Sequence, residues 1–401
     1  MTRFDLLLIA APFVSAWVFL TSITGAPVFN SSLSTPRVLR LNPPGIPTNH
    51  AIPALNAPQD ASPPINTRAP SIKQSRPKSD NIVFFPEWHP ASAVMVSWLD
   101  FDLYYTDLVM KLTRKNQVQI IVDSANQKDH VQTLLSLNRV DPAMVTFYTC
   151  IIDDVWIVDY SPLYITVSNQ PILVDMKYFR TLDDHFPEFL GAVTGLSVQP
   201  MPLVLEGGNV MTDGHGNCFT TTEILAQNPD YSESQIRDFV LSYIGCSRLH
   251  ILKKLSDGTG HIDMYAKLLH EDLMLVGQYE IADKEYEILE YNTRYIENLI
   301  SCTGRRYTVF RIPMPGSPGD YMTYTNSLIV NDQVFVPVYD LPEDSIALCI
   351  YHDAMPGYEI VPVVAVDPIF AGGAIHCTTK IVPQWNASSL PLQESPKASG
   401  K

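Results

Sequence analysis

The chain has 401 residues, of which 46% are hydrophobic and 17% are charged. This composition can build a core, so it excludes bulk disorder. The 32 prolines exclude a long coiled-coil rod, and six cysteines are too few for a disulfide-built scaffold. The net charge of −15 argues against nucleic acid as a partner, because an acidic surface repels the phosphate backbone.

An apolar run at residues 6–23 follows a short start that contains Arg3. This pattern is typical of a signal peptide or a signal anchor, and we assign residues 1–26 to it. A run of this length can also span a bilayer, so a membrane tether through residues 6–23 stays open. We therefore expect the secretory pathway, with the protein either secreted or anchored by an uncleaved N-terminal segment.

Residues 27–80 contain 11 prolines and show no helical or strand period, so we predict a disordered Pro-rich linker. Six basic and two acidic residues give this segment a charge of +4. Because residues 1–26 are neutral, residues 81–401 carry −19. The glycosylation sequons at Asn30 and Asn386 fit secretion but are common by chance.

From residue 81 onward, short β-rich runs alternate with helical ones. We expect strands at 94–98, 118–123, 144–152, 163–167, 171–175, 273–277, 307–313, 327–339 and 360–366. Helical spacing occurs at 125–137 and at 231–243, the second beginning in a plausible capping sequence. This alternation, without an internal linker, predicts one α/β domain over residues 81–390 and a flexible tail over 391–401.

His261 and Asp263 follow a glycine-rich turn and are candidates for a shared site. If residues 261–265 are extended, the two side chains point to the same face. The structural alternative is a turn followed by a surface strand with two solvated polar residues.

Cys377 follows Gly372-Gly373, and a cysteine near a glycine turn, with a histidine elsewhere, is a candidate nucleophile. The alternative is a buried structural cysteine. His376 points to the opposite face if the segment is extended, so we expect His261 to be the partner of Cys377. The sequence has neither HExxH nor paired CxxC spacing, and we therefore expect no metal site.

Five motifs, taken together and in order, resemble those of bacterial-type peptidylarginine deiminases and agmatine deiminases, within the guanidine-modifying enzyme superfamily. They are Trp156-x-x-Asp159, Glu206-Gly-Gly-Asn209, Gly260-His261-Ile262-Asp263, Tyr324-x-Asn326 and Gly-Gly-x-Ile375-His376-Cys377. The opening Phe85-Pro86-Glu87-Trp88 also resembles the first blade of that family. The resemblance covers roughly residues 83–383.

The resemblance implies a five-bladed pseudosymmetric α/β propeller with its site at the central axis. It also implies that no metal or organic cofactor is needed. Successive motif residues lie 47 to 63 positions apart, which suits one contribution from each blade. The implied reaction is hydrolytic deimination, in which a guanidine and water give a ureido group and ammonia through a cysteine thiouronium intermediate.

A guanidinium is a planar cation with donors in a fork, which two carboxylates can bind and neutralise. By resemblance these carboxylates are Asp159 and Asp263, and Cys377 attacks the central carbon. His261 transfers protons to the leaving group and from water, and Glu206 orients His261. The resemblance further assigns Asn326 and Trp156 to substrate binding.

The chain departs from the family at two places in the first motif. The family usually has Trp-x-Arg-Asp, whereas position 158 is valine, and Ser161 stands where a glycine is usual. We expect the missing arginine to be one that positions neighbouring acids such as Asp153 or Asp154, so its loss puts activity in question.

Secretion favours an arginine within a peptide or protein as the substrate, giving peptidyl-citrulline. Arg180 lies 21 residues after Asp159 and matches, by resemblance, an arginine that binds the C-terminal carboxylate of the peptide; a plain surface arginine is the alternative. Agmatine, giving N-carbamoylputrescine, is the alternative substrate. A catalytically inactive homologue that binds arginine peptides is a different class of protein that the valine at position 158 would fit. A cysteine protease is disfavoured, because its oxyanion needs donors rather than acids.

Overall fold

The computed structural model describes residues 82–316 and 321–385. Our predictions for the signal segment, the Pro-rich linker, the tail and both sequons lie outside the described residues. Among the residues that it does describe, no helix is long and apolar enough to cross a membrane.

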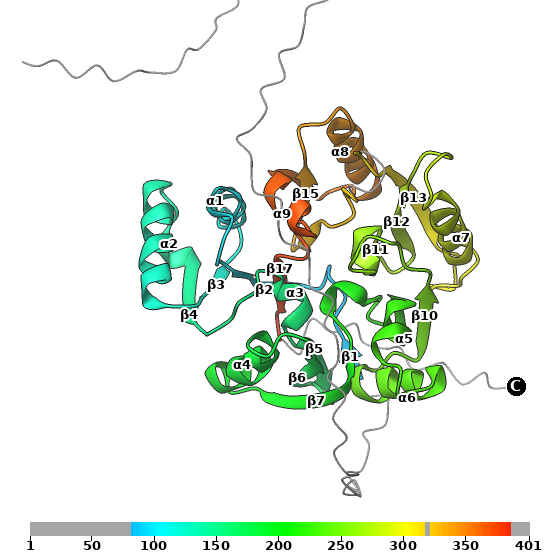
Figure 1. Ribbon diagram of the computed structural model, residues 1–401, viewed down its shortest axis with the longest axis horizontal. Helices are drawn as coiled ribbons and strands as arrows, with labels where there is room; N and C mark the ends of the chain where they lie inside the picture. The colour runs from blue at the N-terminus through cyan, green and yellow to red at the C-terminus, as the bar shows by residue number, and fades with distance from the viewer. Residues whose placement is uncertain (1–81, 317–320, 386–401) are drawn as a thin grey trace, which may run out of the picture. The chain divides into compact units, whose positions relative to one another are not determined.

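The described strands form five small sheets, which Figure 1 shows as separate sectors. In spatial order their strands are β17 (Thr379–Pro383), β2 (Ala91–Ser97), β3 (Val118–Val122) and β4 (Val145–Thr149); β1 (Ile82–Phe84), β5 (Leu163–Val167), β6 (Gln170–Lys177) and β7 (Ser197–Val204); β10 (Arg248–Leu252), β9 (Asn217–Thr221) and β8 (Met211–Thr212); β11 (Ala266–His270), β12 (Leu273–Gln278) and β13 (Thr308–Pro313); and β14 (Leu328–Val330), β15 (Gln333–Val338) and β16 (Glu359–Val364).

The same pattern recurs in every sheet. A first strand pairs antiparallel with a second, and a crossover helix then leads to a parallel third strand. The crossover helices are α1 (Asp102–Leu112), α4 (Phe186–Thr194), α6 (Glu233–Ile244), α7 (Tyr286–Glu297) and α8 (Glu343–Ala354). The first sheet takes its first strand, β17, from the end of the described chain and its second, β2, from near the beginning.

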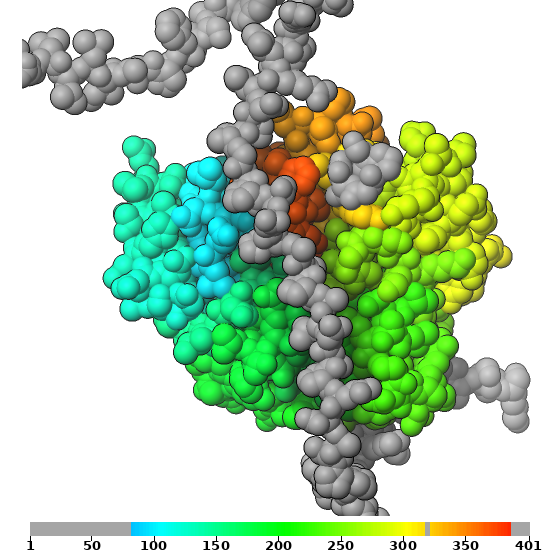
Figure 2. Space-filling model, viewed as in Figure 1, coloured from blue at the N-terminus to red at the C-terminus, as the bar shows by residue number. Residues whose placement is uncertain are grey.

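The remaining described helices are short, apart from α2, which crosses from β3 to β4. They are α2 (Ala125–Leu137), α3 (Ile157–Tyr160), α5 (Glu223–Gln227) and α9 (Val366–Ala371), with 3-10 helices at Pro142–Met144, Asp183–His185, Gly207–Asn209 and Ile262–Met264. Figure 2 shows how successive segments of the chain fill successive sectors of the visible face, from cyan through green and yellow to orange. The alternating elements confirm the predicted α/β class.

The expected elements agree with the structure in most places. Helix α6 begins after a capping box in which Ser232 and Gln235 bond each other reciprocally, as the sequence indicated. The prediction of one strand over 327–339 is wrong, because Asn331 takes a left-handed conformation (φ 53°) and the chain turns back as the hairpin β14–β15. The strand expected at 360–366 ends at Val364, before α9.

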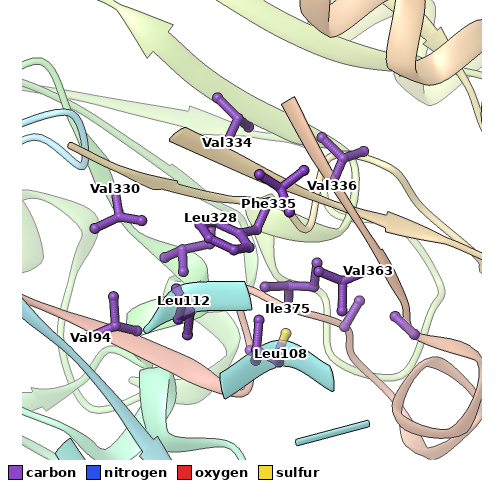
Figure 3. Packing of buried hydrophobic residues seen from close by; sticks show 14 of the residues in the cluster. Val94, Leu108, Leu112, Leu328, Val330, Val334, Phe335, Val336, Val363 and Ile375 are labelled. Carbon is purple, nitrogen blue, oxygen red and sulfur yellow. The ribbon is translucent and has the colours of Figure 1, made fainter. Parts of the chain in front are cut away.

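The largest apolar core joins the first and last sheets. Figure 3 shows Leu108 and Leu112 of α1 packing near Phe335 of β15 and Val363 of β16. Ile375 belongs to the same fully buried cluster and lies two residues before Cys377. The loop that carries the cysteine is thus anchored in a close-packed core, which holds its backbone in one position.

Candidate active site

A short turn precedes one strand in each of the five sheets (β5, β8, β11, β14 and β17), and each turn carries one of the sequence motifs. Five hydrogen bonds link these turns in a cycle, each turn to the next. They run from the Gly208 amide to Asp159 Oδ1 (2.8 Å), from the Ile262 amide to Asn209 Oδ1 (3.3 Å), from Thr325 Oγ1 to the Asp263 carbonyl (3.0 Å), from the His376 amide to the Asn326 carbonyl (3.1 Å), and from the Val158 amide to the Cys377 carbonyl (3.3 Å).

Gly208 lies where three side chains from two neighbouring turns meet: Asp159 from α3, and His261 and Asp263 from the turn before β11. A Cβ atom on Gly208 would lie 2.8 Å from His261 Nδ1, 2.9 Å from Asp159 Oδ1 and 3.0 Å from Asp263 Oδ2. Only glycine fits there, and the close approach shows that the histidine and both carboxylates converge on one point.

The expectation that residues 261–265 are extended is wrong. Residues Ile262–Met264 form a 3-10 turn, and only His261, which precedes it, has extended backbone. The turn nevertheless brings His261 and Asp263 to the same point, by a different backbone geometry from the one that we expected.

His261 is buried and makes a short hydrogen bond from Nε2 to Glu206 Oε2, at 2.7 Å. Gln227 donates to the same oxygen at 2.8 Å and fixes the carboxylate. Burial lowers the pKa of His261, but Asp159, the Glu206 hydrogen bond and Asp263 outweigh it and raise the pKa to about 10. His261 is therefore an imidazolium at neutral pH.

The two aspartates differ in their surroundings. Burial, opposed by His261, raises the pKa of Asp159 to about 7, with Glu206 and Asp263 adding repulsion. Burial also raises the pKa of Asp263, but the hydrogen bond from His376 and nearby cations outweigh it and lower the pKa below its usual value. Asp263 Oδ2 accepts from His376 Nδ1 at 2.7 Å, whereas its Oδ1 is buried without a hydrogen-bond partner among the described residues.

Cys377 is buried beside these acids. Its sulfur lies 3.5 Å from Asp263 Oδ2 and 3.0 Å from Asn326 Nδ2. The other end of Asn326 accepts from the backbone amides of Ala374 (3.0 Å) and Cys377 (3.2 Å). Burial and then the charges of Asp263 and Asp159 raise the thiol pKa well above its ordinary value. Without a bound cation the cysteine is therefore a neutral thiol.

Trp156 also lies close to the sulfur. A Cβ on Gly373 would lie 2.7 Å from Cys377 Sγ and 2.9 Å from Cζ3 of Trp156. Gly373 therefore keeps clear the narrow space between the indole and the nucleophile, where a flat group could enter.

Arg180 lies at the edge of this region rather than in it. Its Nε pairs with the buried Asp154 Oδ2 at 2.9 Å, and its side chain is 41% exposed. Tyr178 donates to the same oxygen at 3.1 Å. The structure thus couples Arg180 to Asp154 in the loop that leads to Trp156, and does not place it against Cys377.

Some neighbours of the site were not predicted. His376 was set aside on the assumption of an extended segment, but residues 374–378 form a turn and aim its ring at Asp263. On its other side His376 Nε2 lies 3.6 Å from Glu87 Oε2, and Glu87 pairs with the buried Lys267. Glu87 lies in the Phe85-Pro86-Glu87-Trp88 motif, and this motif is the feature of the sequence from which its place near the site could have been predicted. The described residues hold no cluster of three or more side chains suited to a metal ion.

The comparisons with known proteins agree with this geometry. A family model described as Porphyromonas-type peptidyl-arginine deiminase matches residues 83–383. A protein of Vibrio parahaemolyticus (serotype O3:K6, strain RIMD 2210633) named "Putative agmatine deiminase" is 29% identical over 220 residues, which are 48% of this chain and 61% of that protein. A Marinomonas protein (strain MWYL1) of the same name is 26% identical over 315 residues, 68% of this chain and 84% of that protein.

Solved structures show the same fold. The agmatine deiminase of Enterococcus faecalis has a TM-score of 0.71 at 22% identity, covering 79% of this chain and 99% of the other. The agmatine deiminase of C. jejuni has a TM-score of 0.67 at 20% identity, covering 76% and 96%. The fold is therefore that of the guanidine-modifying deiminases. With a family model matching most of the chain, this protein belongs to the Porphyromonas-type peptidyl-arginine deiminase family. The chain spans less than two thirds of the length of the Vibrio relative.

Proposed function

We propose that this protein hydrolyses a guanidinium to a ureido group and ammonia through a covalent intermediate on Cys377. The observation that carries the proposal is the convergence of the sulfur, the imidazolium and two carboxylates. Cys377 Sγ lies 3.5 Å from Asp263, which meets His261 and Asp159 at Gly208.

The guanidinium is held by the two aspartates in this proposal. Asp263 Oδ1 is buried and has no hydrogen-bond partner among the described residues, so it has an unmet need for a donor. Guanidinium N–H groups satisfy that need, and Asp159 accepts from the other edge of the cation. Binding also restores the charge of Asp159, whose pKa is raised by burial and, to a smaller extent, by repulsion from Glu206 and Asp263.

Binding of the cation activates the nucleophile. The thiol pKa is raised by burial and by two facing anions, and a guanidinium between them offsets those charges. Asn326 Nδ2, at 3.0 Å from the sulfur, is placed to stabilise the thiolate. The substrate thus lowers the pKa of the group that attacks it, which keeps the thiol unreactive in the empty site.

His261 carries out the proton transfers in this mechanism. Cys377 loses its proton to solvent as the cation binds. The thiolate then bonds to the guanidinium carbon, and His261 gives a proton to the nitrogen that leaves as ammonia, so that a thiouronium remains. The neutral imidazole then takes a proton from water as its oxygen bonds to the same carbon. The carbon–sulfur bond breaks and the hydroxyl proton passes to solvent, which frees the thiolate and the ureido product. Glu206 holds the ring in place throughout.

Agmatine is the substrate that we place first. The curated relatives carry the agmatine deiminase name. The loop beside the site also bears the exposed Asp153, whose carboxylate suits the distal ammonium of agmatine. Peptidyl-arginine is the second candidate, since Arg180 beside this loop keeps part of its guanidinium exposed for a carboxylate.

A direct test incubates the full chain with agmatine and, separately, with an arginine peptide, and measures the ureido product and ammonia. Cys377→Ser is the catalytic control. We expect product from at least one substrate in the wild type and none in the variant. Folded wild-type protein that binds arginine peptide but releases no ammonia would support the inactive binding homologue instead.

We further propose that the five sheets form a closed five-bladed propeller. The cycle of five hydrogen bonds between the inner turns supports this arrangement. So does the pairing of β17 with β2, which joins the two ends of the described chain in one sheet. Deletion of the segment after Cys377 that forms β17 is expected to unfold the protein, which circular dichroism would detect.

We also propose passage through the secretory pathway. The apolar run at residues 6–23 is one support. The disulfide between Cys218 and Cys246 is another, because such bonds persist mainly in oxidising compartments. Expression of the full chain in a secreting host should place the protein in the medium or on the membrane, with this disulfide formed. Retention of a reduced protein in the cytosol would contradict the proposal.

A further inference from the structure

A small cavity lies behind the catalytic turns. Its volume is about 100 Å³, and it is bounded by the segment 84–89, by Val158, by Gly207 and by residues of β17. Glu87 and His376 line it as well, so it borders the far side of the Asp263 cluster. One positively charged group in this cavity, Lys380 of β17, has no place in the mechanism described above.

Lys380 is close to the backbone that carries the first two site motifs. A Cβ on Gly207 would lie 3.4 Å from Lys380 Nζ and in contact with the carbonyl of Val158. The side chain is half-buried, and no hydrogen bond or ion pair reaches its amine within the part of the chain that the structure describes. The amine therefore faces the cavity with its charge unpaired, close to the backbone of Val158, the residue before Asp159.

The residue at position 158 lines the same cavity as Lys380. The family usually has arginine there, and this chain has valine. Val158 lines the same cavity as Lys380, and its amide donates to the carbonyl of Cys377, three residues before Lys380. A cation on residue 158 or on residue 380 would thus occupy the same cavity, the first approaching from α3 and the second from β17.

We propose that Lys380 is a positioning residue that supplies the positive charge behind Asp159 which an arginine at position 158 would otherwise provide. The inference rests on the proposed deiminase function. Asp159 faces Glu206 and Asp263, which repel its charge, so a cation behind it favours the ionised form that binds guanidinium. Lys380 then compensates, within the same cavity, for the positive charge that is missing at position 158, so the valine there does not imply loss of activity.

The proposal predicts a particular pH dependence. Burial lowers the pKa of Lys380 to about 8, against the opposing effect of Asp159 and Glu87. The other titratable groups at this cavity are His376 and His89, and Lys267 pairs with Glu87 beside it. Lysine at position 380 thus loses its charge in mildly alkaline solution, whereas an arginine would keep it.

The test exchanges the charge between the two positions. In Lys380→Met, KM for the guanidine substrate at pH 7 should rise roughly tenfold to hundredfold, as expected for loss of one charge roughly 6–12 Å from the bound cation's carboxylates at an effective dielectric constant of about 20, with a smaller change in kcat. The double variant Val158→Arg/Lys380→Met should regain most of the lost affinity and keep it to higher pH than the wild type. Lys115→Met, at an exposed ion pair, is the matched control.

Two results would overturn the inference. One is a Lys380→Met enzyme with wild-type KM and pH profile, and the other is a folded double variant with no recovery. If Lys380→Met does not fold, Lys380→Arg takes its place, and an unchanged alkaline limb in that variant contradicts the proposal. A wild-type protein that turns over no guanidine refutes the proposed function instead, so the two failures are distinguishable.

Discussion

Replacement of Glu206 by glutamine tests how the imidazolium is maintained. The 2.7 Å bond from His261 Nε2 to Glu206 Oε2 is buried and charge-assisted. Hydrogen bonds of this kind contribute about 1.5–3 kcal/mol. At about 1.4 kcal/mol per pKa unit, Glu206→Gln should lower the pKa of His261 by roughly 1–2 units from its value of about 10.

Two readouts follow from that shift. Because His261 must carry a proton to release ammonia, the alkaline limb of kcat should move down by about 1–2 pH units. The folded pKa of His261 lies above its unfolded value of 6.5, so the charged ring stabilises the fold below pH 6.5 and this stabilisation is lost as pH rises through about 10. In the variant the loss should be complete at lower pH.

The assay is product formation between pH 5 and pH 10, with urea unfolding over the same range. Glu287→Gln, at an exposed position of α7, is the matched control and should leave both profiles unchanged. An alkaline limb that stays in place in a folded Glu206→Gln enzyme would refute the assigned role of Glu206.

Four further predictions concern other parts of the molecule. Gly373→Ala should reduce kcat/KM at least about 100-fold, because its methyl group enters the space beside the sulfur and displaces Cys377. KM should rise about tenfold for each pH unit below 7, as Asp159 takes up a proton in the free enzyme. Cys218→Ser should lower the free energy of unfolding by about 3–4 kcal/mol, since the bond to Cys246 closes a loop with a sequence separation of 28. Lys380→Met should raise the free energy of unfolding at pH 7 by roughly 1–3 kcal/mol, because folding lowers the pKa of this lysine and therefore opposes its charged form. For the same reason, the free energy of unfolding of the wild type should increase as pH rises from about 8 to 10.5.

The fold class was accessible from sequence because most strands are continuous β-branched runs. β5 has the predicted bounds, and β3 ends one residue earlier than predicted. The split of 327–339 was not foreseen, since an Asn-Asp pair within an apolar run can either continue a strand or reverse it. The arrangement of the five sheets came from the family resemblance, because periodicity carries no information on which strands pair.

The candidate site could be predicted as a set of residues but not as a geometry. Motif order identified His261, Asp263 and Cys377, while the assumption of extended backbone misjudged the turn at Ile262–Met264 and discarded His376. Lys380 gave no signal, because a lysine in a strand normally faces solvent. Its position behind Asp159 depends on contacts between β17 and α3, which are distant in sequence and join only in the fold.

The most direct measurement is the site of reaction with an amidine that carries a leaving group, such as 2-chloroacetamidine. Its flat cation should bind between Asp159 and Asp263 and alkylate Cys377 with loss of chloride. Peptide mass spectrometry should find Cys377 modified faster than the exposed Cys302 and Cys349, despite its burial, and agmatine should slow the reaction. Labelling confined to the two exposed cysteines, with Cys377 intact, would contradict the account.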